Sequence, residues 1–301
     1  MNNKTAVSYA IPTEEANPQT AGLDRMTPLQ IARKINAQDF NAARAVKKAA
    51  KPIARAISAA AQAFAGGHKI IFIGAGTSGR LGVLEAAECV PTFGTKPSQI
   101  IGLIAGGKNA MFRAKEGAED DDAQGARDVQ AKAHAQDFVI GLTASGVTPY
   151  VLGALKEAKK LGAHTALLTC NPGADFSHAD IALYLPTGPE VLCGSTRMKA
   201  GTATKMALNT ITTGAMALCG KMYGNLMADV RPTNKKLIAR ATRLIMQIAR
   251  TDQATAARYL TLSGQQVKTA CIMICKQVDK PTAEKLLKKV NGFLGRVLHD
   301  A

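Results

Sequence analysis

The chain has 301 residues, and 47% of them are hydrophobic, which is enough apolar surface for one large domain with a smaller one attached. It carries 38 Lys and Arg against 22 Asp and Glu, a formal net charge of +16. Aromatic residues make up only 4% and Trp is absent, so the sequence lacks the stacking platforms typical of single-strand nucleic-acid binding. The charge therefore suits an anionic substrate or merely a soluble surface, and we expect no nucleic-acid partner.

The N-terminal region is polar. It has no apolar core like that of a signal peptide, and no run anywhere approaches the roughly 18 apolar residues that cross a bilayer. We expect a cytoplasmic protein without membrane contact. Residues 1–24 contain Pro12, Pro18 and Gly22, which predict an extended arm lying on the body or on a partner subunit. Residues 28–65 predict a short helix followed by a long one, with Thr27 as the N-cap.

Short apolar runs then alternate with segments of helical length. The runs that we predict as strands are Lys69 to Ile73, Gln99 to Ile104, Phe138 to Thr143, Thr165 to Cys170 and Ile181 to Leu185. The helices predicted between and after them are Gly79 to Cys89, Asn109 to Ala118, Pro149 to Leu161 and Met198 to Met222. Continuous apolar strands alternating with helices are typical of an α/β fold, a doubly wound parallel sheet with helices on both faces.

Beyond residue 234 the strand-like runs give way to basic amphipathic helices. The sequence thus predicts three parts. These are an N-terminal arm and helix (residues 1–50), a sheet domain (51–233) and a small all-helical C-terminal domain (234–301).

The first predicted strand runs directly into a glycine-rich segment that contains Gly76, Thr77, Ser78 and Gly79. Glycines at the start of a helix let backbone N–H groups approach an anion, so this segment predicts a phosphate cradle. It also matches the GxGxxG pattern of dinucleotide-binding proteins. That interpretation requires an acidic residue at the end of the second strand, where this chain has two glycines, and the extra hydroxyls favour a phosphate monoester.

A second candidate cradle, Ser145, Gly146, Val147 and Thr148, follows the third predicted strand. Loops at the carboxyl ends of neighbouring parallel strands meet at one crevice, so both cradles are expected to hold one ligand. A third segment, residues 188–202, includes Ser195 and Lys199, and its hydroxyls and cations suit either anion contact or a subunit interface.

Candidate carboxylates lie in two places. Glu85 and Glu88 lie on the helix after the first cradle, where exposure to solvent is the simplest interpretation for both. Residues 116–122 form an acidic run that includes Glu119, and composition alone does not single out any member of it. The five histidines form no metal-binding pattern, and we expect neither a metal nor a cofactor.

Several long blocks together resemble the N-acetylmuramic acid 6-phosphate etherases. They are IGAGTSGRLGVLEAAECVPTFGT (residues 73–95), GLIAGG (102–107), EGAEDD (116–121), ASGVTPYVLGAL (144–155), CNPGA (170–174), GPEVLCGSTRMKAGTATKMALN (188–209) and YGNLMADVRPTN (223–234). The resemblance implies the sugar isomerase (SIS) fold, a homodimer and a lyase that removes D-lactate from a sugar phosphate. It assigns acid and base catalysis to Glu88 and Glu119.

Two positions depart from the family pattern. Ala16 and Val147 stand where these etherases usually have arginine, which puts some ligand contacts in doubt. Two other functions remain open. One is a sugar-phosphate sensor without catalysis, like the related glucokinase regulatory proteins, and the other is an aldose-ketose isomerase of the same fold.

Overall fold

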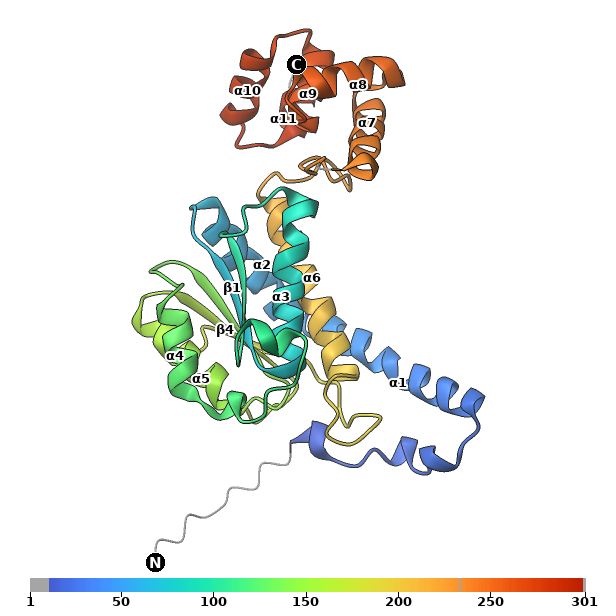
Figure 1. Cartoon of the computed structure of the whole chain (residues 1–301), viewed down its shortest axis with the longest axis vertical. Helices are drawn as coiled ribbons and strands as arrows, with labels where there is room; N and C mark the ends of the chain where they lie inside the picture. Colours follow the sequence, from blue (N-terminus) through green and yellow to red (C-terminus); the bar gives the residue numbers. More distant parts are fainter. Residues whose placement is uncertain (1–10, 233, 300–301) are drawn as a thin grey trace, which may run out of the picture.

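The structure, a computed structural model that describes residues 11–232 and 234–299, contains one sheet of five parallel strands (Figure 1). In spatial order the strands are β2 (Ile100–Ile104), β1 (Ile70–Gly74), β3 (Phe138–Leu142), β4 (His164–Thr169) and β5 (Ile181–Tyr184). Each lies within one residue of a predicted apolar run. The prediction of a doubly wound parallel sheet is confirmed.

Helices cover both faces of this sheet. Ile70 and Phe72 of β1 point to a core that also contains α2 (Ala50–Ala65), α3 (Gly76–Phe93) and α6 (Lys199–Leu218). Ile71 and Ile73 point to the opposite core, beneath α4 (Asp122–Gln130) and α5 (Pro149–Lys160). Successive side chains of a strand alternate between faces, so a strand that is apolar throughout must be buried on both.

The first long helix is α1 (Pro28–Lys48), and Thr27 caps it as predicted. Its side chain accepts a hydrogen bond from the Gln30 amide, and Gln30 bonds back to the Thr27 amide, so the two residues form a capping box. The predicted order of a short and then a long helix is wrong, because α1 has 21 residues and α2 has 16. The break falls at Ala49. No strong helix breaker marks this position, so the sequence does not show where the first helix ends.

The predicted helix at residues 109–118 is also wrong. The structure has only two short 3-10 turns, Lys108–Met111 and Ala118–Asp120, and a regular helix, α4, begins at Asp122. Gly106, Gly107 and Gly117 adopt positive φ angles of 83°, 73° and 71°. Such angles interrupt a right-handed helix, and only glycine adopts them without strain.

The described part of the N-terminal arm, residues 11–25, forms three short 3-10 turns and is not simply extended. It lies on the loop between β5 and α6. The Gly194 amide donates to the Thr13 carbonyl at 2.9 Å, and the Thr20 hydroxyl donates to the Val191 carbonyl at 2.8 Å. Residues 1–10 of the predicted arm lie outside the described residues.

The C-terminal helices are α7 (Lys235–Ala249), α8 (Gln253–Leu262), α9 (Val267–Lys276), α10 (Lys280–Lys289) and α11 (Leu294–His299). They enclose their own apolar core, which includes Leu244, Ile245 and Ile272. In Figure 1 this group lies beyond the end of the sheet domain, joined to it by residues 219–232. The expected all-helical C-terminal region is thus present, and the boundaries at residues 50 and 233 stay predictions.

Candidate active site

The two predicted cradles follow the neighbouring strands β1 and β3. Gly74 pairs with Leu142 in the parallel register, so both chains leave the sheet at the same edge. The strand order reverses direction between β1 and β3, and ligands of open α/β sheets bind at such a switch point. The two cradles therefore lie side by side, as the sequence predicts.

In the first cradle, α3 begins at Gly76, and the first helical bond joins the Gly79 amide to the Ala75 carbonyl at 3.1 Å. The amides of Gly76, Thr77 and Ser78 therefore have no acceptor within the helix. No side chain caps this helix end, and the partly exposed hydroxyls of Thr77 and Ser78 lie beside it. Free amides at a helix N-terminus attract an anion such as phosphate.

Hydrogen bonds to the Thr143 hydroxyl, at the end of β3, hold the second cradle in shape. The buried Thr143 hydroxyl lies 2.7 Å from that of Thr148 and 3.3 Å from that of Ser145, and it accepts from the Gly146 amide at 3.1 Å. Val147 is 42% exposed, so its side chain is directed toward solvent while its amide remains in the loop. The loop thus keeps its backbone geometry without an arginine at position 147.

The third predicted segment meets the first cradle at the start of α6. A Cβ atom added to Gly201 would lie 3.4 Å from the Thr77 side chain, so the two helix starts are in contact. Ser195 lies in the turn before α6 and is partly exposed. Lys199 is only 1% exposed, and its ammonium donates to the Gln38 side chain of α1 at 3.2 Å. Burial lowers the pKa of Lys199, and its proposed contact with phosphate stays a prediction.

Glu119 lies beside the first cradle. It belongs to the 3-10 turn Ala118–Asp120 and lines a cavity of about 160 Å³ together with Gly76 and Arg80. The Arg80 side chain donates to the Met111 carbonyl at 3.0 Å and thereby holds the irregular segment that carries Glu119. One carboxylate of the predicted pair therefore shares a cavity with the first predicted cradle.

Glu88 lies elsewhere on the same chain. It is exposed on α3, twelve residues beyond Gly76, which corresponds to about 18 Å along the helix axis. Within one chain, the structure does not place Glu88 in the cavity of Glu119. The geometry therefore leaves the first cradle with only one of the two predicted glutamates.

Comparison with known proteins identifies the family of this chain. N-acetylmuramic acid 6-phosphate etherase of Oenococcus oeni is 48% identical to this chain over 95% of its length and 97% of the relative's. The same enzyme of Serratia proteamaculans is 46% identical, covering 96% of this chain and 98% of its own. This chain belongs to the N-acetylmuramic acid 6-phosphate etherase family. Residues 52–159 also match the glucokinase regulatory protein N-terminal SIS domain, and residues 119–214 match the SIS domain.

Several polar residues that shape the site in this etherase family member were not predicted. Glu190 is completely buried, and its two oxygens accept from the amides of Lys199 and Ala200 at 3.0 and 2.8 Å, so it caps α6 from a distance. The Asn171 side chain donates to the Ser145 carbonyl at 2.8 Å and braces the second cradle. Thr143 and Asn171 are polar residues just after buried strands, and this position in the sequence could have identified them as part of the site.

Glu85 is the clearest difference from the expectation of solvent exposure. It is 6% exposed and faces α6, where the Thr212 hydroxyl lies 2.5 Å from one carboxyl oxygen and the Asn209 amide donates to the other. Burial raises the pKa of Glu85, and the two hydrogen bonds partly oppose this effect. Glu85 therefore packs between two helices of the etherase fold.

Within residues 11–232 and 234–299, no helix is both long and apolar enough to span a bilayer. The same residues contain no group of three or more His, Cys, Asp or Glu side chains arranged to hold a metal ion.

Proposed function

We propose that this chain is a cytoplasmic etherase that cleaves the D-lactyl ether of N-acetylmuramic acid 6-phosphate. The observation that carries the proposal is the cavity that Glu119 shares with the start of α3, where free helix amides suit the phosphate. Family membership over nearly the whole chain supports this substrate. The products are N-acetylglucosamine 6-phosphate and D-lactate, which places the reaction in the recycling of cell-wall amino sugars.

The reaction is an elimination followed by the addition of water. When the sugar ring is open, the aldehyde at carbon 1 acidifies the proton on carbon 2, and the lactyl ether on carbon 3 is in position to leave. A base removes that proton, and an acid protonates the departing ether oxygen. Water then adds to carbon 3, and carbon 2 is protonated again. Two carboxyl groups with different surroundings suit these steps.

Each proposed residue has a separate task. Glu119 acts as the base at carbon 2, and Glu88 protonates the leaving lactate. The amides and hydroxyls of both cradles hold the phosphate, with Ser195 and Lys199 at the start of α6. Phosphate binding is remote from the reacting carbons, so its binding energy fixes carbons 2 and 3 against the carboxyl groups.

A homodimer resolves the separation of the two glutamates. Carbons 2 and 3 of a sugar phosphate bound in the first cradle lie only a few bonds from its phosphate, whereas Glu88 of the same chain lies about 18 Å along α3. Glu88 is exposed, so it is available to a second chain. We therefore assign each site to two subunits, with Glu119 from one chain and Glu88 from the other.

The reaction is tested by measuring D-lactate released from N-acetylmuramic acid 6-phosphate. We expect release by the wild type, and a rate at least about a hundredfold lower for Glu88→Gln and for Glu119→Gln, because each removes a proton-transfer group. Glu284→Gln, on an exposed helix of the C-terminal domain, is the matched control and should keep full activity. Sugar-phosphate binding by the wild type without lactate release would contradict the lyase and favour the sensor.

Sharing of the site between subunits is tested by mixing inactive variants. Co-expressed Glu88→Gln and Glu119→Gln chains form some mixed dimers, and in each of these one site retains both wild-type glutamates if they come from different chains. We expect lactate release to return in the purified mixed dimer. If both glutamates belonged to one chain, every site would carry one substitution, and the mixed dimer would stay as inactive as its parents.

A further inference from the structure

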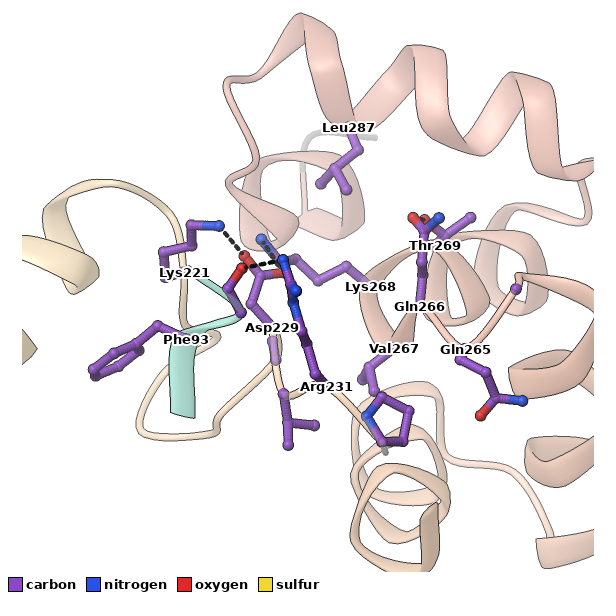
Figure 2. A pocket seen from close by; sticks show the side chains of 15 residues that line it. Phe93, Lys221, Asp229, Arg231, Gln265, Gln266, Val267, Lys268, Thr269 and Leu287 are labelled. Carbon is purple, nitrogen blue, oxygen red and sulfur yellow. Dashed lines mark hydrogen bonds and ion pairs between the residues drawn. The ribbon is translucent and has the colours of Figure 1, made fainter. Parts of the chain in front are cut away.

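A second cavity lies far from the strand ends, at the junction with the C-terminal helices (Figure 2). Its volume is about 500 Å³, within the range of small-molecule pockets. The end of α3 at Gly94, the connecting segment with Asp229 and Arg231, and the start of α9 form its walls. Junctions between domains are frequent sites of ligand binding.

Positive charge dominates this cavity. Among the described residues that line it, Lys221, Arg231 and Lys268 are cationic, and Asp229 is the one carboxylate. The two Asp229 oxygens lie 3.1 Å from the Lys221 ammonium and 2.8 Å from that of Lys268. Three cationic side chains thus share the cavity with one carboxylate. The two excess positive charges would balance the two negative charges of a phosphate dianion.

The basic side chains differ in how many of their N–H groups have hydrogen-bond acceptors within the protein. Lys268 is 5% exposed, and besides Asp229 its ammonium donates to the Gly220 and Gly292 carbonyls at 2.9 and 3.0 Å. The Arg231 guanidinium, in contrast, donates only one hydrogen bond within the described residues, from Nη2 to the Gly94 carbonyl at 2.9 Å. Its remaining N–H groups are free to bind a phosphate oxygen in the forked geometry that arginine favours.

Uncharged polar side chains also line the cavity. Figure 2 shows Gln265 and Gln266 to one side of Arg231, near the start of α9. No side chain caps the first amides of α9, and the residues that carry them, Val267 to Thr269, are buried. Apolar side chains, among them Leu287, complete the lining and suit the carbon skeleton of a small organic phosphate.

We propose that this junction cavity is a second anion site, which binds a phosphate dianion, either inorganic phosphate or a small phosphate monoester. Arg231 is its main ligand, and Lys221 and Lys268 supply the field. The site is distinct from the cradles of β1 and β3 and does not depend on the proposed etherase activity. A ligand held between Arg231 and α9 would tie the C-terminal helices to the end of α3.

The test is hydrogen–deuterium exchange by mass spectrometry on the full chain, with inorganic phosphate in one arm and glucose 6-phosphate in the other. We expect saturable protection of residues 264–269 and 228–232, separate from any protection at the cradles. Arg231→Gln should weaken binding at the junction about tenfold or more, because a charge-assisted hydrogen bond is lost. Arg243→Gln, an exposed arginine on α7 outside the cavity, should leave it unchanged. Protection by glucose 6-phosphate alone would identify a monoester as the ligand.

A second variant covers the case in which Arg231→Gln fails to fold. Gln265 is exposed on the cavity rim, so Gln265→Glu adds a negative charge with nearly the same shape. It should also weaken phosphate binding at the junction. Protection confined to the cradles at saturating phosphate, or equal junction affinity in the wild type and the folded variants, would overturn the proposal.

Discussion

Glu85 and Glu88 lie one turn apart on α3 and have different surroundings. Glu88 is exposed, whereas Glu85 faces the Thr212 hydroxyl of α6. Thr212 has a single hydroxyl hydrogen but lies near three acceptors, the Glu85 carboxyl, the Leu208 carbonyl at 3.1 Å and the Asn209 carbonyl at 3.4 Å. When Glu85 is protonated, it can donate to Thr212 while Thr212 donates to Leu208, so both contacts are satisfied. The buried contact therefore accommodates the neutral form of Glu85.

This contact predicts a pH dependence of stability. Burial raises the pKa of Glu85 in the folded chain. The resulting contribution of Glu85 to the free energy of unfolding is therefore fully present below about pH 4.3, and it is lost as the pH rises through the pKa of the folded chain. Glu85→Gln cannot ionise and retains the shape. We expect the free energy of unfolding of Glu85→Gln, relative to the wild type, to increase from pH 4 to pH 8 in urea titrations.

The control for this measurement is Glu284→Gln, which alters an exposed glutamate on α10. Its difference from the wild type should stay nearly constant over the same pH range. A constant difference for Glu85→Gln as well would mean that Glu85 titrates alike in the folded and unfolded chains.

At the level of elements, strands were predictable because buried parallel strands are apolar along their whole length, as Ile70–Gly74 is. The segment between β2 and α4 was not, because backbone angles at Gly106, Gly107 and Gly117 decide its path. The glycine-rich cradles could be found from the sequence, since the chemistry is local. The burial of Glu85 could not, because its partner Thr212 is 127 residues away.

Helices α4 and α5 pack unusually closely, and two glycines allow this contact. A Cβ atom on Gly125 would lie 1.9 Å from the Tyr150 carbonyl oxygen, and one on Gly153 would lie 2.2 Å from that of Asp122. Both obstacles are backbone atoms, so a side-chain rotation cannot remove the clash. The Tyr150 hydroxyl donates to Asp128 at 2.6 Å and further joins the two helices.

We therefore predict that Gly125→Ala destabilises the chain, although alanine is the better helix former. The helices must move apart, and overpacking of this kind costs about 1–3 kcal/mol. Chemical denaturation at neutral pH measures the change. Lys156→Ala, at an exposed position of α5, should stay within about 0.5 kcal/mol of the wild type. An unchanged or increased stability of Gly125→Ala would contradict the close contact.

On the scale of the whole molecule, charge is unevenly distributed. Residues 234–299 contain 13 of the 38 Lys and Arg but only three of the 22 Asp and Glu. The ion pair of Asp229 with Lys268 joins this basic group of helices to the connecting segment, within which Asp229 also pairs with Lys221. Burial lowers the pKa of Lys268, and the Asp229 carboxylate opposes that change and favours its charged form.

Removing this carboxylate should weaken the attachment of the C-terminal helices. Asp229→Asn leaves the nearly buried Lys268 without its counter-charge, and we expect a loss of about 2–3 kcal/mol in the free energy of unfolding. Faster proteolysis within residues 219–232 should accompany it. Glu284→Gln breaks an exposed ion pair with Lys280 and should change little. Equal stability of Asp229→Asn and the wild type would show that the ion pairs contribute nothing.

The place of α6 in the chain has a consequence for synthesis on the ribosome. One face of the sheet is covered partly by this helix, whose buried residues extend from Ala200 to Met216, whereas the opposite face is covered by α4 and α5, which are made earlier. Until α6 leaves the exit tunnel, the nascent chain exposes the apolar side chains that α6 will cover. During this interval, a chaperone that binds exposed apolar segments has its most favourable target. The C-terminal helices emerge after α6 and fold through contacts among themselves, so they add little to this delay.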